Sequence, residues 1–454
     1  MKRRIFVIIL SLITNIHLQA QSSQDDYCRD LDTTYHIINV KDYSFNELLN
    51  EGIFTLSRQL DILNVPIRKF QWIIKWHIKR HHFALNQREK NIHRTTFRTI
   101  SFSYPSISPR GESQWLSGLV TFPVLANNKP TRMLIYHRIL APSYKIAPSN
   151  SLPIEAVLTA DNTICVFPDY YGCGITEGEN LPYVSLNYHG QCAAECALAA
   201  LDIVRDAGII LSDEFYTWNT GYSQGGGYAL ATHKYIENSL PQNQSELINL
   251  KWSLCGDGVY SPAMYYENAI LTGNMGSTPT VFLQGLRSLF YGHKDLMGDL
   301  SLRDFLSKKA NAVCLDSLLL THDDGLWDLS DKIEEYIKSH DPADYFSPMV
   351  LDTSTAQFKT LMFAFNLDDC ILNWTPHAPV VLLHSKKDNC VPYQQATNTF
   401  TLLSANPGHC FLVNPKKNGT HVFTSILYFS NILHQSEDKL YKKLVESQKE
   451  KNAD

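Results

Sequence analysis

The spacing of hydrophobic positions changes along the chain and predicts a helical arm followed by a sheet. Between residues 45 and 77, apolar side chains recur every three to four positions, as on one face of an amphipathic helix. From residue 97 the period becomes two, which predicts an antiparallel pair of strands. Short apolar runs follow, and up to residue 255 helix-length segments mostly separate them: 133–136, 163–167, 215–220, 250–255, 380–384 and 411–413. Such runs are typical of a parallel sheet buried on both faces.

The segment between the fourth and fifth of these runs is too long for a single crossover helix. It contains amphipathic helix patterns and an apolar cluster at Leu361–Phe365, and we expect a mainly helical cap inserted on the sheet. The predicted organisation follows directly: a signal peptide (1–20), an N-terminal helical arm (21–96), an α/β core of mostly parallel sheet flanked by helices (97–262 and 377–454), and the cap (263–376). The charge-dense stretch 437–454 is expected to be a solvated helix or a frayed tail.

Charge and the first residues narrow the partners and the compartment. The chain of 454 residues has a net charge of −5, so it lacks the basic excess that tracks a phosphate backbone, and we expect no nucleic-acid partner. Residues 1–20 combine a basic start, an apolar stretch and a small residue, Ala20, which predicts a secretory signal and a secreted or periplasmic protein. No later segment is long and apolar enough for a stable membrane span.

Cysteine and histidine spacing gives little support for a metal or cofactor. Ten cysteines permit disulfides without requiring them, and their pairing stays open. His77 and His81 lie four apart but lack an acidic or cysteine ligand, and a solvated basic face is the better interpretation. Cys192 and Cys196, in an alanine-rich segment, are expected to be core thiols. Neither a phosphate-binding loop nor a dinucleotide fingerprint is present, so we predict no cofactor and no metal.

A G-x-S-x-G sequence, residues 221–225 (GYSQG), is the main chemical signal. It follows the strand pattern 215–220 and precedes small and apolar residues that open a helix. A nucleophile elbow needs this placement, because the serine lies at a strained strand-to-helix turn where glycines permit close backbone approach. We therefore expect Ser223 to be the nucleophile, with the backbone N–H of Gln224 facing an oxyanion. The alternative is a structural glycine-rich turn.

A serine nucleophile needs a base and an acid that orients the base. Asp388 follows the strand 380–384 in a loop, where a carboxylate can reach an imidazole on the next loop, and it is the predicted acid. Asp257, after the preceding strand, is the rival. His421 follows the last strand and opens the final helix pattern, which makes it the predicted base. Of its competitors, His409 precedes that strand and His384 lies within a strand pattern as an expected core histidine.

The second oxyanion donor is expected in the loop after residues 133–136. The backbone N–H groups of residues 138–141 are the candidates, and Arg138 is named because it follows His137 where a glycine is usual. Its guanidinium could instead face solvent or an acidic group.

These residues resemble the α/β-hydrolase superfamily and, within it, the secretory lipase family. The resemblance spans residues 117–429 without most of the insertion, and its landmarks are SGLV (117–120), PDYYG (168–172), ALDIVRD (200–206) and GYSQGG (221–226). It implies an α/β-hydrolase fold, a Ser223, Asp388 and His421 triad, and hydrolysis of carboxylic esters beneath a cap. The acid loop DNCVP (388–392) is also similar to that of prolyl-oligopeptidase-type peptidases, but the helical arm cannot supply their β-propeller.

The expected function is therefore a secreted serine esterase or lipase that works through an acyl-enzyme on a small-molecule or lipid ester. A peptidase or amidase with the same triad is the alternative. A binding protein on a hydrolase scaffold is the third interpretation, which the presence of all three triad residues in order disfavours. Acyl-chain length, alcohol moiety and oligomeric state stay open.

Overall fold

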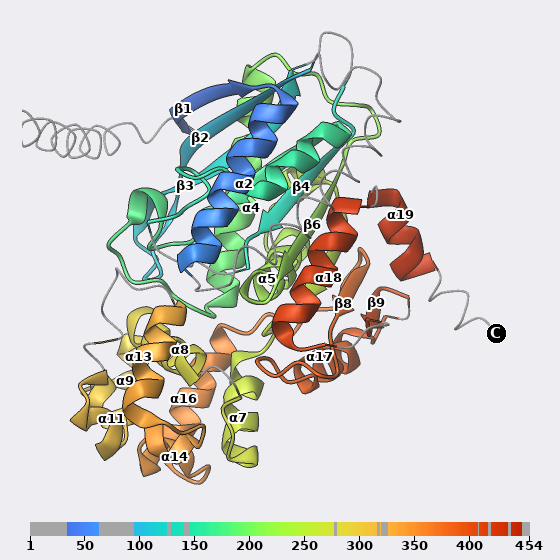
Figure 1. Cartoon of the computed structure of the whole chain (residues 1–454). Helices are drawn as coiled ribbons and strands as arrows, with labels where there is room; N and C mark the ends of the chain where they lie inside the picture. Colours follow the sequence, from blue (N-terminus) through green and yellow to red (C-terminus); the bar gives the residue numbers. More distant parts are fainter. Residues whose placement is uncertain are drawn as a thin grey trace, which may run out of the picture.

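A nine-stranded, mostly parallel sheet forms the centre of the molecule (Figure 1). The computed structural model describes residues 34–62, 95–124, 129–139, 145–276, 279–315, 318, 326–406, 408–415, 419–434 and 437–446. Within this part of the chain the strand order is β1-β2-β3-β5-β4-β6-β7-β8-β9. Strands β4 to β9 pair with one another in parallel, whereas β1, β2 and β3 pair antiparallel, and β3 joins the parallel part through β5. The strands are β1 (His36–Tyr43), β2 (Thr96–Ile107), β3 (Ser113–Val124), β4 (Arg132–His137), β5 (Thr163–Pro168), β6 (Tyr216–Tyr222), β7 (Leu250–Gly256), β8 (Val380–Leu383) and β9 (Cys410–Val413).

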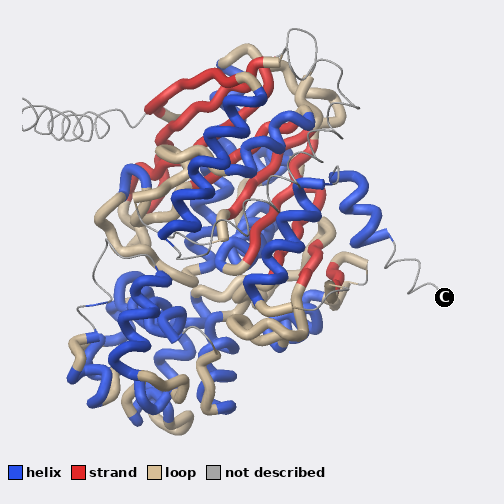
Figure 2. Tube along the Cα trace, in the orientation of Figure 1, coloured by secondary structure: helices blue, strands red, loops and turns tan. Residues whose placement is uncertain are grey.

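The helices divide into those that flank the sheet and those that follow β7 in the cap (Figure 2). The flanking set is α2 (Phe45–Ile62), α4 (Leu186–Asp206), α5 (Gln224–Asn238), α6 (Gln242–Ile248), α17 (Gln394–Leu403), α18 (His421–His434) and α19 (Glu437–Tyr441), with η2 (Ile154–Asp161), η3 (Gly174–Thr176) and η4 (Lys442–Glu446). The cap set is α7 (Pro262–Thr272), α8 (Pro279–Gly292), α9 (Lys294–Met297), α10 (Leu302–Phe305), α11 (Lys308–Ala312), α13 (Leu326–Ile337), α14 (Pro342–Tyr345), α15 (Pro348–Leu351) and α16 (Ala356–Leu367).

Side chains of the parallel strands alternate between two apolar clusters, one on each face. On β4, Met133 and Ile135 pack in a cluster with α4, while Leu134 and Tyr136 pack in a cluster with α2 and α18. Because both faces are covered, every β4 residue except Arg132 is buried. This double burial is the physical reason for the continuous apolar runs from which the sequence predicts a parallel sheet.

The N-terminal arm is only partly helical. Residues 36–43 form β1, the edge strand, which pairs antiparallel with β2, so the expectation of a helical arm is wrong for this stretch. β1 pairs with the backbone groups along the edge of β2 that β3 leaves free, and β-branched residues such as Ile37 and Val40 suit a strand there. The helix α2 does form, and it packs closely on η2: a Cβ on Gly52 would lie 2.9 Å from the Cα of Ile154. The proposed signal peptide and the His77/His81 pair lie outside the described residues.

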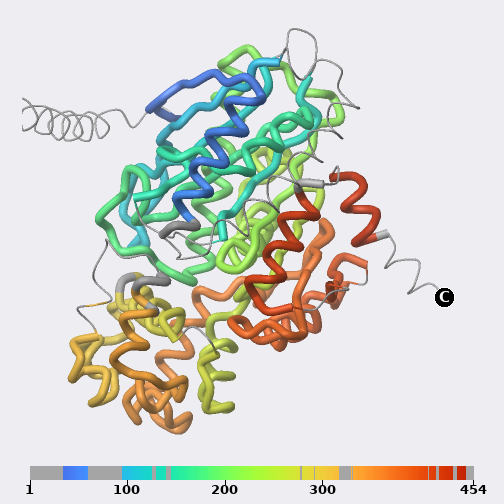
Figure 3. Tube along the Cα trace, in the orientation of Figure 1, coloured from blue at the N-terminus to red at the C-terminus, as the bar shows by residue number. Residues whose placement is uncertain are grey.

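The cap gathers at one end of the molecule, in yellow and orange in Figure 3. Its buried side chains form one continuous apolar cluster with those of α5 and α17. Polar contacts also join it to the core: the Asn187 side-chain amide donates to the Leu367 carbonyl at 2.6 Å, and the Lys234 ammonium to the Asp369 carbonyl at 3.3 Å. The cap is therefore packed against the core helices α4, α5 and α17.

Two further observations concern cysteines and membrane spans. The nine described cysteines are free thiols, and Cys192 and Cys196 are buried in the apolar cluster between α4 and the sheet, as the sequence predicts. Among the described helices, none combines the length and the apolar character that crossing a bilayer requires.

The last described helix is attached to the sheet by a buried carboxylate. Glu437, at the start of α19, is 7% exposed and accepts hydrogen bonds from the Tyr216 hydroxyl and the Trp252 indole N–H. Its Oε2 also lies 3.5 Å from Nη1 of Arg132. The expectation of a solvated tail from residue 437 is therefore wrong at its first residue, because strand side chains supply the partners that a buried carboxylate requires.

Replacing Glu437 by alanine should lower the free energy of unfolding by about 3 kcal/mol, because Arg132, the half-buried Tyr216 hydroxyl and the buried Trp252 N–H lose their acceptor. Urea unfolding followed by circular dichroism measures this change. The control is Asp438→Ala: that side chain is 70% exposed, and we expect a change of at most about 0.5 kcal/mol. Equal stability of the two variants would contradict the proposed attachment.

Candidate active site

Ser223 lies in a strained turn between β6 and α5. Its backbone angles, φ 58° and ψ −121°, fall in a region that non-glycine residues rarely adopt. Its amide donates to the carbonyl of Gly256, the last residue of β7, at 2.8 Å. The neighbouring glycines make the turn possible: a Cβ on Gly221 would lie 2.2 Å from the Gly225 oxygen, and a Cβ on Gly225 would lie 2.3 Å from the His137 oxygen. The turn therefore has the geometry that the G-x-S-x-G sequence predicts.

His421 links Ser223 to Asp388. It is the first residue of α18, and its Nε2 lies 2.8 Å from Ser223 Oγ while its Nδ1 lies 2.6 Å from Asp388 Oδ2. With the Nδ1 proton donated to the carboxylate, Nε2 presents its lone pair to the serine hydroxyl. The three predicted triad residues thus form one continuous chain of hydrogen bonds.

Asp388 is held as an anion by its loop. Its Oδ1 accepts hydrogen bonds from the backbone N–H groups of Cys390 and Val391, both at 2.8 Å. Burial raises the pKa of the Asp388 carboxyl, but the hydrogen bond and charge of His421, the charge of His384 and the Val391 amide outweigh burial and lower it. The carboxylate is therefore ionised where it contacts His421.

The His421 imidazole is correspondingly more basic than usual. Burial lowers the pKa of His421, but the hydrogen bond to Asp388 and the charges of Asp388 and Asp257 outweigh it, so that the pKa lies above its ordinary value of 6.5. The site favours an imidazolium once a proton arrives, which is what a general base requires.

Sequence reasoning missed three side chains that support this chain of hydrogen bonds. The Asn389 side-chain oxygen accepts from the His421 amide at 3.2 Å, and the Ser385 hydroxyl donates to the Gly419 carbonyl at 2.7 Å. The Tyr222 hydroxyl lies 2.6 Å from the His421 carbonyl oxygen, within hydrogen-bond distance. Asn389 and Tyr222 each adjoin a predicted triad residue in the sequence, and this adjacency is the sequence feature that could have indicated them.

The other candidates for the base and the acid have hydrogen-bond partners other than Ser223. His384 is buried, and its Nε2 donates to the Val391 carbonyl at 3.0 Å. His409 is bound through Nδ1 to the His377 carbonyl and precedes β9, at the opposite end of the strand from His421. Asp257 is fully buried behind the triad, where it accepts from the Tyr222 hydroxyl and from the Ser385 amide.

Gln224 and the backbone of Arg138 both adjoin the turn at Ser223. Gln224 is the first residue of α5, so its N–H has no acceptor within the helix. The Arg138 carbonyl is 2.6 Å from where a Gly225 Cβ would lie, which places this backbone against the turn. The Arg138 guanidinium contacts two other residues: its Nη2 lies 3.1 Å from Cys173 Sγ, and the group lies 4.9 Å from the centroid of the Tyr170 ring. Residues 140–144 of the same loop lie outside the described residues.

Asp257, His384 and Asp388 form a buried cluster whose ligand-type atoms lie within 4.8 Å of one another. Both carboxylates already accept hydrogen bonds from neighbouring donors on each oxygen. Metal coordination would need these lone pairs to point at one ion instead. We therefore assign the cluster as hydrogen-bonded charges and place no metal in it.

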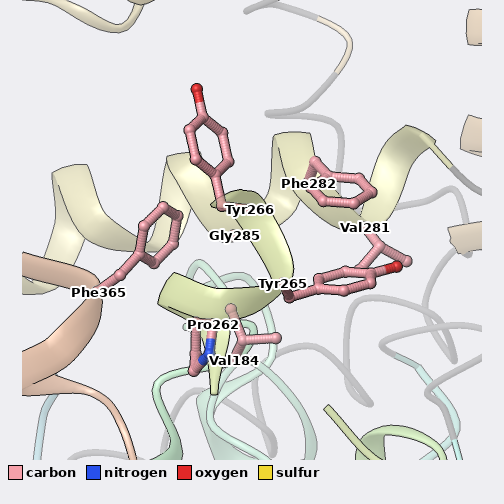
Figure 4. A pocket seen from close by; sticks show the side chains of 8 residues that line it. All are labelled: Val184, Pro262, Tyr265, Tyr266, Val281, Phe282, Gly285 and Phe365. Carbon is pink, nitrogen blue, oxygen red and sulfur yellow. The ribbon is translucent and has the colours of Figure 1, made fainter. Parts of the chain in front are cut away.

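A small apolar pocket lies among the cap helices α7, α8 and α16, where they meet Val184 of the core (Figure 4). The free space between its side chains, open solvent included, is about 230 Å³, and the lining residues are Val184, Pro262, Tyr265, Tyr266, Val281, Phe282, Gly285 and Phe365. Val184 lines it with φ 60°, a conformation that is strained for a β-branched residue. The Tyr265 hydroxyl donates to the Cys390 carbonyl at 2.9 Å, which joins the pocket to the loop that carries Asp388.

Solved structures with a similar fold include esterases and a lipase. No protein-family model and no curated protein matches this sequence. The chain is similar to the rice cell wall degrading esterase LipA from Xanthomonas oryzae, at 17% identity and a TM-score of 0.64 over 92% of this chain and 98% of that one. A ligand-bound form of the same esterase gives 18% identity and a TM-score of 0.64, over 91% and 99%. Candida antarctica lipase A gives 14%, a TM-score of 0.51, and 73% and 74%. The fold is thus that of the α/β-hydrolases, as the sequence predicts.

Gly225→Ala should destabilise the protein by about 3 kcal/mol, because the added Cβ meets two backbone oxygens that cannot rotate away. Urea unfolding provides the measurement. Gly292→Ala serves as the control, since the nearest heavy atom to its Cβ is 3.8 Å away, and we expect a change of no more than about 1 kcal/mol. Wild-type stability of Gly225→Ala would show that the elbow is not as closely packed as described.

Proposed function

We propose that this protein is a secreted serine hydrolase that cleaves carboxylic esters, with Ser223 as nucleophile, His421 as base and Asp388 as the acid that orients it. The observation that carries the proposal is the continuous hydrogen-bond chain from Ser223 Oγ through both nitrogens of His421 to Asp388. The strained elbow and the raised pKa of His421 support the same assignment. The lipase and esterase neighbours agree with it.

The reaction follows from the geometry. His421 Nε2 takes the proton of Ser223 Oγ as this oxygen attacks the ester carbonyl carbon, and Asp388 stabilises the resulting imidazolium. The oxyanion receives hydrogen bonds from the Gln224 N–H and from the loop after β4 that begins at Arg138. His421 then gives its proton to the departing alcohol oxygen. A water molecule, deprotonated by the same histidine, attacks the acyl-enzyme and releases the acid.

The apolar pocket supports an ester with an apolar acyl group. Its lining is aliphatic and aromatic, and Tyr265 connects it to the acid loop, so an acyl chain that leaves Ser223 towards the cap would meet apolar side chains. Export would rest on residues 1–20, whose pattern is that of a signal peptide.

Ser223→Ala should reduce kcat/KM on p-nitrophenyl esters by a factor of about 10⁴ or more, because the covalent route is lost. Ser354→Ala removes an exposed hydroxyl from the cap and should keep full activity. Esters of graded chain length and aminoacyl anilides are compared with the same enzyme. Full esterase activity in Ser223→Ala would refute the elbow assignment, and anilide cleavage without ester turnover would favour the amidase alternative.

The pH profile of kcat/KM should rise to a plateau with a midpoint above 6.5, because His421 must be neutral to accept a proton and its pKa is raised. Asp388→Asn removes the main group that raises this pKa, so the midpoint should move to lower pH. The same variant should lose about 10⁴ in kcat, since the histidine loses its orientation. A midpoint that does not move in Asp388→Asn would contradict the assignment of His421 and Asp388 as a catalytic pair.

A further inference from the structure

A second carboxylate lies directly behind the predicted triad. Asp257 follows β7 and is fully buried, and its backbone adopts φ 37°, which is uncommon for a non-glycine residue. Its amide donates to the Leu383 carbonyl at 2.8 Å, and its Oδ1 accepts from the Ser385 amide at 2.8 Å. The carboxylate is thus fixed between the ends of β7 and β8, the same edge of the sheet from which Ser223 and Asp388 emerge.

Tyr222 connects Asp257 to the catalytic histidine. Its hydroxyl is hydrogen-bonded to Asp257 Oδ2 and also lies 2.6 Å from the His421 carbonyl. Its ring packs against the His421 ring, with centroids 5.2 Å apart. A phenol has one proton for two acceptors, so its hydrogen bonding to the His421 backbone depends on whether Asp257 is ionised. A change in the charge of Asp257 therefore alters the hydrogen bonding of the His421 backbone through Tyr222.

His384 separates the two acids. Its Nδ1 is 3.8 Å from Asp257 Oδ1, and its Nε2 is 3.8 Å from Asp388 Oδ2. Nε2 carries the proton that it donates to the Val391 carbonyl, and Nδ1 has no hydrogen-bond partner among the described residues. The imidazole of His421, by contrast, meets Asp388 directly through Nδ1 at 2.6 Å, and the charges of Asp388 and Asp257 both raise the pKa of His421.

Titratable groups surround Asp257 on every side. The groups that face it are Tyr222 from β6, Tyr260 from the segment after β7, His384 and Asp388 from the segment after β8, and His421 from α18. Burial, together with the Asp388 charge, raises the pKa of Asp257 to about 6, against the opposing effects of His384, His421 and the Tyr222 hydroxyl. Asp257 is consequently ionised over the pH range in which His421 acts as a base.

We propose that Asp257 is a positioning residue of this site: its negative charge supports the His421 imidazolium behind Asp388, and its hydrogen bond to Tyr222 fixes the phenol against the His421 backbone. This inference rests on the proposed function and adds a second carboxylate to it. The acid of the triad remains Asp388, which contacts the imidazole directly. Asp257 acts on the reaction only through His421.

The first test compares Asp257→Asn with Glu155→Gln. Glu155 is a matched control, because it is also a buried carboxylate that accepts from a buried tyrosine hydroxyl, that of Tyr136 at 3.0 Å. In Asp257→Asn we expect kcat to fall about 10-fold and the acidic midpoint of kcat/KM to move to lower pH, as a base with less electrostatic support does. In Glu155→Gln the midpoint should stay at the wild-type value. An unmoved midpoint in Asp257→Asn overturns the proposal.

A third variant distinguishes the effect of the Asp257 charge from that of the Tyr222 hydroxyl. Tyr222→Phe removes the hydroxyl and keeps the Asp257 carboxylate, so kcat should fall while the midpoint moves less than in Asp257→Asn. A kcat equal to that of wild type in Tyr222→Phe would overturn the part of the proposal that concerns the phenol.

The second test needs no ester. In protein with ¹⁵N-labelled histidine, the midpoint of the His421 imidazole titration should lie at lower pH in Asp257→Asn than in the wild type, and at the wild-type value in Glu155→Gln. An equal midpoint in Asp257→Asn and wild type would overturn this inference whether or not the chain cleaves esters. Absence of ester turnover in the wild-type protein, with the shifted midpoint present, would speak against the proposed function alone.

Discussion

The backbone turn at Ser223 is the constraint on which the rest of the site depends. Its amide is bonded to the end of β7, and Gly225 lies so close to the His137 carbonyl that no side chain fits between them. These contacts fix the serine, the start of α5 and the loop after β4 in one rigid arrangement. The positive φ of Ser223 is strain that the packed strands around it sustain.

Parallel strands then supply the polar groups. The carboxyl ends of β6, β7 and β8 lie side by side, so the residues that follow them, Ser223, Asp257 and the loop with Asp388, meet at one edge of the sheet. His421, at the start of α18 after β9, lies at the same edge. Burial strengthens the charge interactions at this edge, so His421 is affected both by Asp388, which it contacts, and by the more distant Asp257.

The cap contacts the loop that carries Asp388. It departs after β7 and returns before β8, and its first helix carries Tyr265 to the acid loop. Its apolar cluster is continuous with that of the core helices α5 and α17, so its position relative to Ser223 is set by side-chain packing rather than by the chain connections alone. An apolar pocket at this junction is a consequence of the packing.

The sequence by itself determined the parallel sheet and the long helical segment between β7 and β8, and it indicated Ser223, Asp388 and His421 as candidate site residues. The reasons are that double-sided burial leaves continuous apolar runs and that a nucleophile elbow needs glycines around its serine. It did not determine the edge strand β1, whose partner is a backbone edge that no pattern in residues 36–43 reveals. Nor did it show the burial of Glu437 or the joint arrangement of Asp257, Tyr222 and His384 around His421. These depend on contacts between residues far apart in the chain, and such contacts exist only once the strands have packed.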